Sequence, residues 1–180
     1  MRAVAEIASW LAGRIAERGE AVDRPLVEAA ALLHDVDKLL PQTPGDPWIH
    51  GLAGADWLVW KGHAELAPAV ATHPVFRLAE DDGDRIAGPA APLEVRIVAY
   101  ADKRAGQQIE PMASRFAGWA RRYPHGWSGE VVEVARRRAE LLEADVCRRA
   151  GVAPAGVRRL RWTGAALAEG RARRETRWMA

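Results

Sequence analysis

The chain has 180 residues, of which 49% are hydrophobic and 28% are charged, and Cys147 is its single cysteine. This length and apolar content suffice for one compact domain with a hydrophobic core, without help from disulfides or a structural metal. A single cysteine excludes an internal disulfide and a thiolate cluster, so a bound metal would need histidine and carboxylate ligands.

Charged residues, glycine or proline interrupt every apolar stretch well before the roughly 20 residues that a membrane span requires. The N-terminus also lacks the charged, apolar and small-residue pattern of a signal sequence. Because a lone cysteine suits a reducing compartment, we expect a cytoplasmic protein without a membrane partner.

The net charge of +2 is unevenly distributed. Residues 157–180 contain seven arginines against Glu169 and Glu175, which gives +5 there and 2 − 5 = −3 elsewhere. Such a segment could attract an anionic polymer. However, almost all basic residues are arginine, which suggests a genome-wide bias, so we expect a solvated helix face and no nucleic-acid partner.

Apolar residues recur at spacings of three and four in several segments, whereas alternating strand patterns are scarce. Val4, Ile7 and Leu11 begin such a stripe, and Asp23 and Pro25 suit the start of the next helix. In chain order, the first helix is predicted for 2–18, and the second runs from the Asp23 cap to the His34–Asp35 pair. Further helices are predicted for 51–61, 64–72, 93–106, 130–150 and 165–174. Residues 77–92 are predicted to form the longest loop. The predicted fold class is all-α.

No repeat or linker divides the sequence, so we predict a single domain over residues 1–180. Its metal-site core would occupy residues 1–125. Residues 126–180 would form a C-terminal helical extension that carries the basic tail.

Two aspartates lie on apolar stripes of predicted helices. Asp35 follows the run 30–33, and Asp102 continues the stripe of Val95 and Val98. A buried carboxylate costs several kcal/mol unless it is paired or coordinates a cation. Lysine or arginine could be the partner, but His34 places a nitrogen ligand beside Asp35, and this combination suits a divalent cation.

His50 and His73 also lie at the ends of apolar helical segments. Taken singly, each histidine or aspartate is more often a helix cap, a hydrogen-bonded core residue or a surface group than a metal ligand. Together with His34, Asp35 and Asp102, they suggest a shared cleft.

Four segments, residues 32–38, 50–55, 72–74 and 99–102, resemble the HD-domain metal-dependent phosphohydrolases. The resemblance covers roughly residues 2–123 and implies a compact helical bundle. It is strongest for small bacterial members that hydrolyse nucleotides, including diadenosine tetraphosphate. By this resemblance, one metal is held by His34, Asp35 and Asp102, and a second by His50, His73 and the bridging Asp35.

One position departs from the family pattern. That pattern opens with a further histidine ligand about four residues before a Val-Ala pair, and here Val4–Ala5 would place it immediately before Met1. The sequence therefore leaves two alternatives, a first metal site that lacks one ligand or a native protein that starts further upstream.

Other polar and aromatic residues carry competing interpretations. Lys38 and Arg104 could contact substrate phosphates or simply be solvated partners of nearby carboxylates. Asp37 suits a residue that supports a ligand more than a ligand itself. For Trp48 and Trp57, packing or a pocket wall is favoured over stacking on a base, and His63 and His125 are expected on the surface.

The preferred function is metal-assisted hydrolysis of a phosphate ester or anhydride, with a nucleotide or another small phosphate compound as substrate. Asp35, Lys38 and Arg104 are the candidate catalytic residues, and the cofactor would be one or two divalent ions, Fe, Mn, Mg, Co or Zn. The first alternative is a non-catalytic nucleotide-binding or sensing module, and the second is nucleic-acid binding or nuclease activity. A homodimer is compatible with the sequence.

Overall fold

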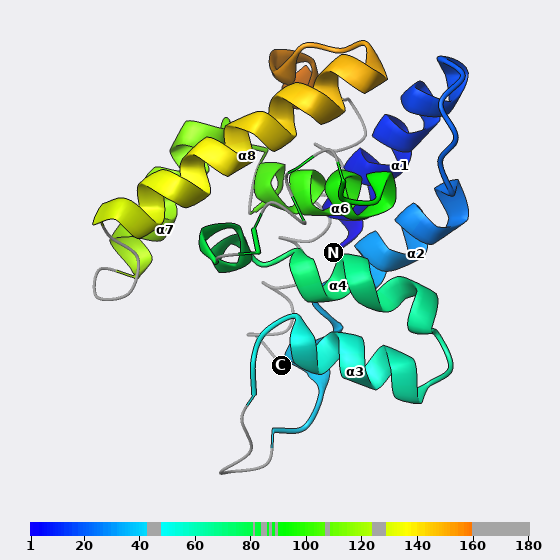
Figure 1. Ribbon diagram of the computed structural model, residues 1–180, viewed down its shortest axis with the longest axis vertical. Coiled ribbons are helices and arrows are strands. Elements are labelled where there is room, and N and C mark those ends of the chain that lie inside the picture. The colour runs from blue at the N-terminus through cyan, green and yellow to red at the C-terminus, as the bar shows by residue number, and fades with distance from the viewer. Residues whose placement is uncertain are drawn as a thin grey trace, which may run out of the picture.

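The structure is a computed structural model that describes residues 1–42, 48–80, 82–83, 86, 88, 90–106, 109–123 and 129–159. The all-α prediction is confirmed, because the described ranges hold α-helices, short 3₁₀ helices and no strand (Figure 1). The α-helices are α1 Arg2–Glu17, α2 Arg24–Leu33, α3 Leu52–Trp60, α4 Ala67–Thr72, α6 Leu93–Arg104, α7 Met112–Arg122 and α8 Gly129–Ala150. The 3₁₀ helices are η1 Val36–Leu39, η2 Ala64–Leu66, η3 Val75–Ala79 and η4 Pro154–Arg159.

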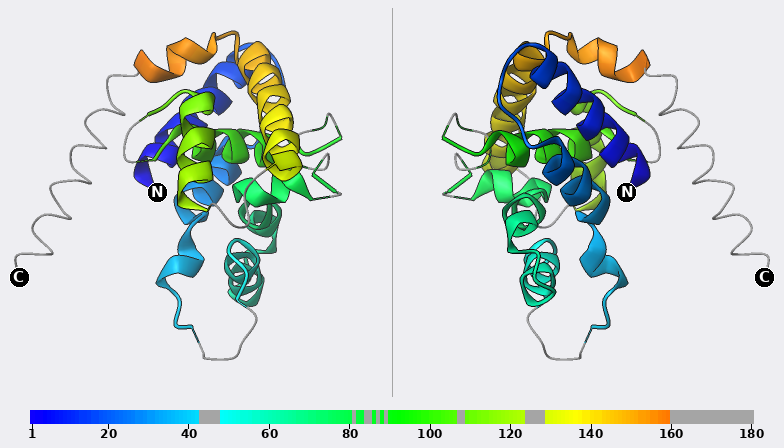
Figure 2. Two further views of the ribbon diagram at one scale, coloured as in Figure 1. Left: turned by 90° about the vertical axis from the view of Figure 1, so that its left-hand side faces the viewer. Right: turned by 90° about the vertical axis from the view of Figure 1, so that its right-hand side faces the viewer.

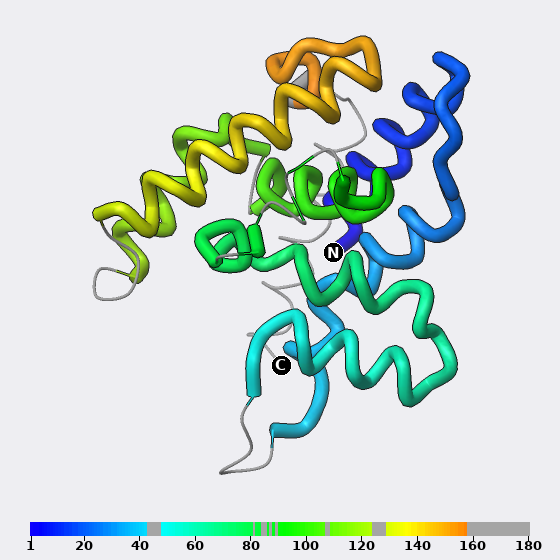
Figure 3. The backbone as a smooth tube through the Cα atoms, viewed as in Figure 1, coloured from blue at the N-terminus to red at the C-terminus, as the bar shows by residue number. Residues whose placement is uncertain are grey.

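Helix α6 is the centre of the bundle. It packs against α1, α2, α4, α7 and α8, and the tube drawing shows it crossing the middle of the molecule (Figure 3). Helices α3 and α4 pack on each other at the end of the molecule away from α8 (Figure 2). The bundle therefore brings residues from α2, α4 and α6 together near its centre.

The predicted stripe of the first helix is its buried face. Ile7, Leu11 and Ile15 have no solvent exposure, and each such side chain contributes roughly 1.5–3 kcal/mol by burial. The helix ends before Gly19, whose φ of 86° lies in the left-handed region that favours glycine. The sequence thus fixes both the buried face of α1 and its end.

Helix α2 begins as its sequence predicts. The Asp23 carboxylate accepts a hydrogen bond of 2.9 Å from the backbone N–H of Leu26, and a proline occupies the first turn. The backbone N–H of Asp23 in turn donates to the carboxylate of Glu94, at 2.9 Å, in the first turn of α6. This contact ties the start of α2 to the start of α6.

Proline separates the predicted helix over 64–72 into two parts. Residues 64–66 form η2, and α4 then starts at Ala67 with Pro68 in its first turn, where a missing N–H leaves no helical hydrogen bond unmade. Within the predicted loop over 77–92, the described residues include the end of η3.

Helix α7 was not predicted. Its signal was present, because Met112, Phe116 and Trp119 recur at spacings of four and three directly after Pro111, and Met112 and Phe116 are buried. Gly118 and the short length weaken this pattern. The predicted helix over 165–174, the basic tail beyond residue 159 and His125 lie outside the described residues.

No helix among the described residues is long and apolar enough to cross a membrane.

Arg104, at the end of α6, is buried in a polar network that joins α6 to α8. Its guanidinium donates to the Tyr100 hydroxyl at 2.6 Å and to the Glu143 carboxylate at 2.9 Å. It also donates to the carbonyls of Glu110 and Pro154. Tyr100 lies 3.3 Å from the thiol of Cys147, and burial raises the pKa of both groups. Arg104 therefore holds the C-terminal part of the described chain against α6.

Because the network is buried, removing its cation should strongly destabilise the fold. Arg104→Leu leaves the carboxylate of Glu143 with the hydroxyl of Tyr100 but without a cation, and we expect the free energy of unfolding to fall by about 3–5 kcal/mol. Urea denaturation followed by circular dichroism measures this change.

The matched control for Arg104→Leu is Arg148→Ala. Arg148 pairs with Asp145 at 2.6 Å on the exposed side of α8, where an ion pair contributes about 0–1 kcal/mol. An equal, small loss of stability in both variants would contradict a structural role for Arg104.

Candidate metal centre

Two histidines of the site are fixed by the same local device. His34 follows the last residue of α2 and His73 follows the last residue of α4. In each case Nδ1 lies 2.7 Å from the carbonyl three residues earlier, that of Ala31 or Val70. Because a carbonyl can only accept, Nδ1 must donate, and a neutral ring then presents Nε2 as a free lone pair.

His50 is oriented by a carboxylate instead. Its Nδ1 lies 2.9 Å from Oδ2 of Asp37, which is fully buried and also accepts a 2.7 Å hydrogen bond from the backbone N–H of Gly51. Gly51 has a φ of 86°, and a Cβ on it would lie 2.8 Å from the ring of Pro74. Glycine is therefore needed to place His50 beside the His73–Pro74 segment.

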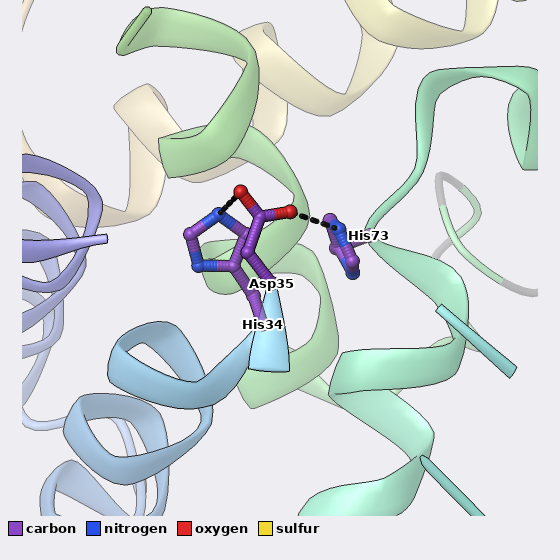
Figure 4. Close-up of side chains that lie close together, drawn as sticks. All are labelled: His34, Asp35 and His73. Atoms are coloured by element: carbon purple, nitrogen blue, oxygen red, sulfur yellow. Dashed lines mark ion pairs between the residues drawn. The ribbon is translucent and has the colours of Figure 1, made fainter. Parts of the chain in front are cut away.

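The three Nε2 atoms converge on Asp35. Its Oδ2 lies 3.5 Å from Nε2 of His34, and its Oδ1 lies 3.5 Å from Nε2 of His50 and 3.6 Å from Nε2 of His73. Figure 4 shows the carboxylate of Asp35 between the rings of His34 and His73. A single carboxylate thus faces imidazoles on both of its oxygens.

Asp102 completes the cluster from α6. Its Oδ1 lies 3.5 Å from Nε2 of His34, although 102 − 35 = 67 positions separate it from Asp35 in the sequence. The next residue, Lys103, is fully buried and donates to the carbonyl of His73 at 2.9 Å and to that of Ala99 at 3.2 Å. Helix α6 therefore both contributes a carboxylate and holds the end of α4.

Burial and charge shift the pKa values within this cluster. Burial lowers the pKa of His34, which favours its neutral form. Burial works against ionisation of Asp35 and Asp102, but the surrounding histidines and lysines outweigh it and keep the pKa of both carboxyl groups below the usual range. The pKa of Lys103 is lowered to about 8, mainly by burial; the charge of Asp102 opposes this shift and that of Arg115 adds to it. Neutral imidazoles and ionised carboxylates are the forms that bind metals.

The donor set fits divalent cations. Nε2 of His73 lies 3.2 Å from Nε2 of His50, an arrangement that leaves two lone pairs facing each other unless a proton or a cation lies between them. Ligand atoms of His34, Asp35 and His73 lie within 4.8 Å of one another, as do those of Asp35, Asp37 and His50. Such a set of imidazole and carboxylate ligands suits zinc, iron or manganese.

A cavity of about 580 Å³ opens onto the cluster, a size usual for a small-molecule site. Asp35, His50 and Asp102 belong to its wall. The remaining lining residues are basic, aromatic or apolar, namely Lys38, Trp48, Pro74, Val75, Phe76, Arg115, Trp119, Arg122 and Tyr123. The cavity therefore joins the candidate ligands to a wall that can bind anions and rings.

The two cations predicted to contact phosphate have different environments. Lys38 lines the cavity, is half-exposed, and its Nζ lies 2.6 Å from Oδ1 of Asp35. Arg104 does not line the cavity, because its guanidinium is directed into the buried network with Glu143. Arg104 therefore does not lie where the predicted phosphate contact would require it. Arg115, which the sequence analysis did not single out, lines the cavity instead.

The remaining predictions concern aromatic and polar neighbours. Trp48 lines the cavity and stacks on His50, with ring centroids 6.1 Å apart and planes at 17°. Trp57 instead packs against the core. His63 is exposed, as expected. Asp37 supports His50, in line with its predicted role beside the ligands.

The chain was compared with known proteins. Comparisons with curated proteins and with solved structures found no significant match. The family model described as HD domain matches residues 1–106, which is more than half of the chain and contains all five candidate ligands. The chain therefore belongs to the HD domain family.

Proposed function

We propose that this protein is a metal-dependent phosphohydrolase that acts on a phosphate ester or anhydride, with nucleotides as the substrate class. The observation that carries this proposal is the convergence of three Nε2 atoms on the two oxygens of Asp35. HD domains are generally metal-dependent hydrolases, so the family membership supports the reaction class. The substrate class is inferred from the cavity wall.

The residues around Asp35 form two groups, each of which would hold one cation. His34 and Asp102 would hold a cation on one side of Asp35, and His50 and His73 would hold a second on the other side. Divalent cations bound there would acidify a water molecule and offset the charge that develops on phosphate. The hydrogen bonds at Nδ1 keep the rings in this arrangement before the substrate arrives.

Lys38 would bind a phosphate oxygen of the substrate. Its ammonium is flexible and half-exposed, and it already lies beside Asp35. With a cation held at Asp35, this ammonium would be free to donate a charge-assisted hydrogen bond to phosphate. The aromatic side chains of Trp48 and Phe76 supply apolar surface for a base.

The proposal predicts that Asp35→Ala removes the metal, since its carboxylate serves both positions. We expect the purified variant to lose most of its divalent metal, and turnover of nucleoside phosphates to fall more than about 100-fold, beyond the change typical of residues that only support ligands. Metal analysis of the purified protein, together with phosphate release from a nucleotide panel, measures both effects.

Asp56→Ala, on the exposed side of α3, is the matched control for Asp35→Ala and should change neither quantity. Full metal content in Asp35→Ala would refute the site. Nucleotide binding without turnover by the metal-loaded wild-type chain would favour the sensing alternative over hydrolysis.

The contact between Asp37 and His50 generates a separate prediction. In Asp37→Asn the amide oxygen can still accept hydrogen bonds from Nδ1 of His50 and from the backbone N–H of Gly51, but it carries no charge to strengthen the ring as a ligand. We expect affinity for the metal on the His50 side to fall about 10–100-fold.

Titration of chelator-treated Asp37→Asn with Mn²⁺, followed by calorimetry, measures that affinity. The free energy of unfolding of the metal-free protein should be measured beside it. Unchanged Mn²⁺ affinity would show that Asp37 does not act through His50.

A further inference from the structure

Helix α7 forms a wall of the cavity and lies beyond residues 1–106, the region that the HD domain family model matches. Arg115, Trp119 and Arg122 of this helix line the cavity. The family match therefore says nothing about this wall, and its chemistry must be derived from these residues themselves.

Arg115 is a cation that lies against an aromatic ring. Its guanidinium carbon lies 4.7 Å from the ring centroid of Trp119, and its Nε is buried with no hydrogen-bond partner in the described part of the chain. Among the residues that the structure describes, no carboxylate forms an ion pair with it. On its other side the guanidinium lies against Gly106, in space that a Cβ at that position would need.

Trp119 holds this guanidinium in place. Its ring packs edge-to-face on the buried ring of Phe116, with centroids 5.1 Å apart and planes at 87°. A tryptophan fixed in this way supplies a flat, electron-rich face for a guanidinium. Arg115 is thus oriented before any ligand binds, which reduces the entropy lost on forming a hydrogen bond.

An anion bound at Arg115 would satisfy the donors of its guanidinium. Phosphate suits the planar fork of arginine.

We propose that Arg115, oriented by Trp119, binds a second phosphate group of the substrate, adjacent to the group that reacts at Asp35. This inference rests on the proposed function, in which one phosphate lies at the cluster of His34, Asp35 and Asp102. The cavity then has two anion sites, and the substrate class is a nucleoside diphosphate or a longer phosphoanhydride. A nucleoside monophosphate fills only one of them.

Binding tests this proposal without turnover. The probes are α,β-methylene-ADP, whose bridging carbon resists hydrolysis between its phosphates, and AMP, titrated by calorimetry into the full chain loaded with Mn²⁺. We expect the wild-type protein to prefer α,β-methylene-ADP by about 10-fold or more. Arg115→Gln should weaken that ligand about 10- to 100-fold, the range of a lost charge-assisted hydrogen bond, and AMP less than about 3-fold.

Arg121→Gln is the matched control, because Arg121 is exposed on the same helix and does not line the cavity. It should leave both affinities unchanged. Trp119→Leu should weaken α,β-methylene-ADP by less than Arg115→Gln does, and the double variant should lose little more than Arg115→Gln alone, since Trp119 acts through Arg115.

Several outcomes would overturn the proposal. These are no preference between the two probes in the wild-type protein, no binding of either, or an equal loss of both in Arg115→Gln. If Arg115→Gln does not fold, Arg115→Lys keeps the charge without the fork and should lose part of the preference at an unchanged melting temperature. An unchanged preference in that variant also contradicts the proposal.

Measuring hydrolysis rates beside binding shows whether the phosphate site at Arg115 or the hydrolase activity at Asp35 fails. Arg115-dependent binding without any Asp35-dependent hydrolysis would refute the hydrolase and retain the phosphate site. Asp35-dependent hydrolysis with equal rates on nucleoside monophosphates and diphosphates, and no effect of Arg115→Gln, would refute the phosphate site alone.

Discussion

The arrangement of the site depends on the hydrogen bonds at Nδ1 of three histidines. A ring whose Nδ1 faces a carbonyl or a carboxylate is held as a donor at that atom, so its Nε2 must act as an acceptor. In His34 and His73 the partner is a carbonyl of the preceding helical turn, and in His50 it is Asp37. These three partners therefore determine both the direction and the chemical character of the candidate ligands around Asp35.

Three consecutive residues of α6 connect this cluster to the rest of the bundle. Asp102 faces His34, Lys103 donates to the carbonyl of His73, and Arg104 turns into the network with α8. Successive side chains on a helix point about 100° apart, so adjacent positions can serve the site, the neighbouring helix and the far side of the core. Because α6 lies at the centre of the bundle, it makes all three contacts from one turn.

The sequence predicted the fold class, the main helix boundaries and the residues that meet at Asp35. Taken singly, each of these histidines and aspartates has a more common explanation, and it is the whole set, together with the resemblance to the HD-domain family, that groups His34, Asp35 and Asp102 in the sequence. Arg104 shows the limit of this reasoning. Its position one turn from buried apolar residues is equally consistent with a phosphate contact and a buried ion pair, and only packing against Glu143 decides between them.

Helix α7, which was not predicted, shows that sequence spacing can also leave a functional residue unrecognised. Its three apolar residues predict a buried face, but sequence spacing does not say which cavity the remaining face meets. Arg115 becomes interpretable only when Gly106 and Trp119 are seen to enclose its guanidinium beside the cluster.

The cavity therefore combines two parts with different origins in the chain. The candidate metal ligands come from the region that the family shares, and the oriented arginine comes from a helix beyond it. Metal ligands set the reaction class, because they determine where a cation and a phosphate can meet. Substrate choice depends on the differential binding of groups that do not react. Under the proposed function, a change in α7 would therefore alter which phosphate compound binds while leaving the geometry around Asp35 intact.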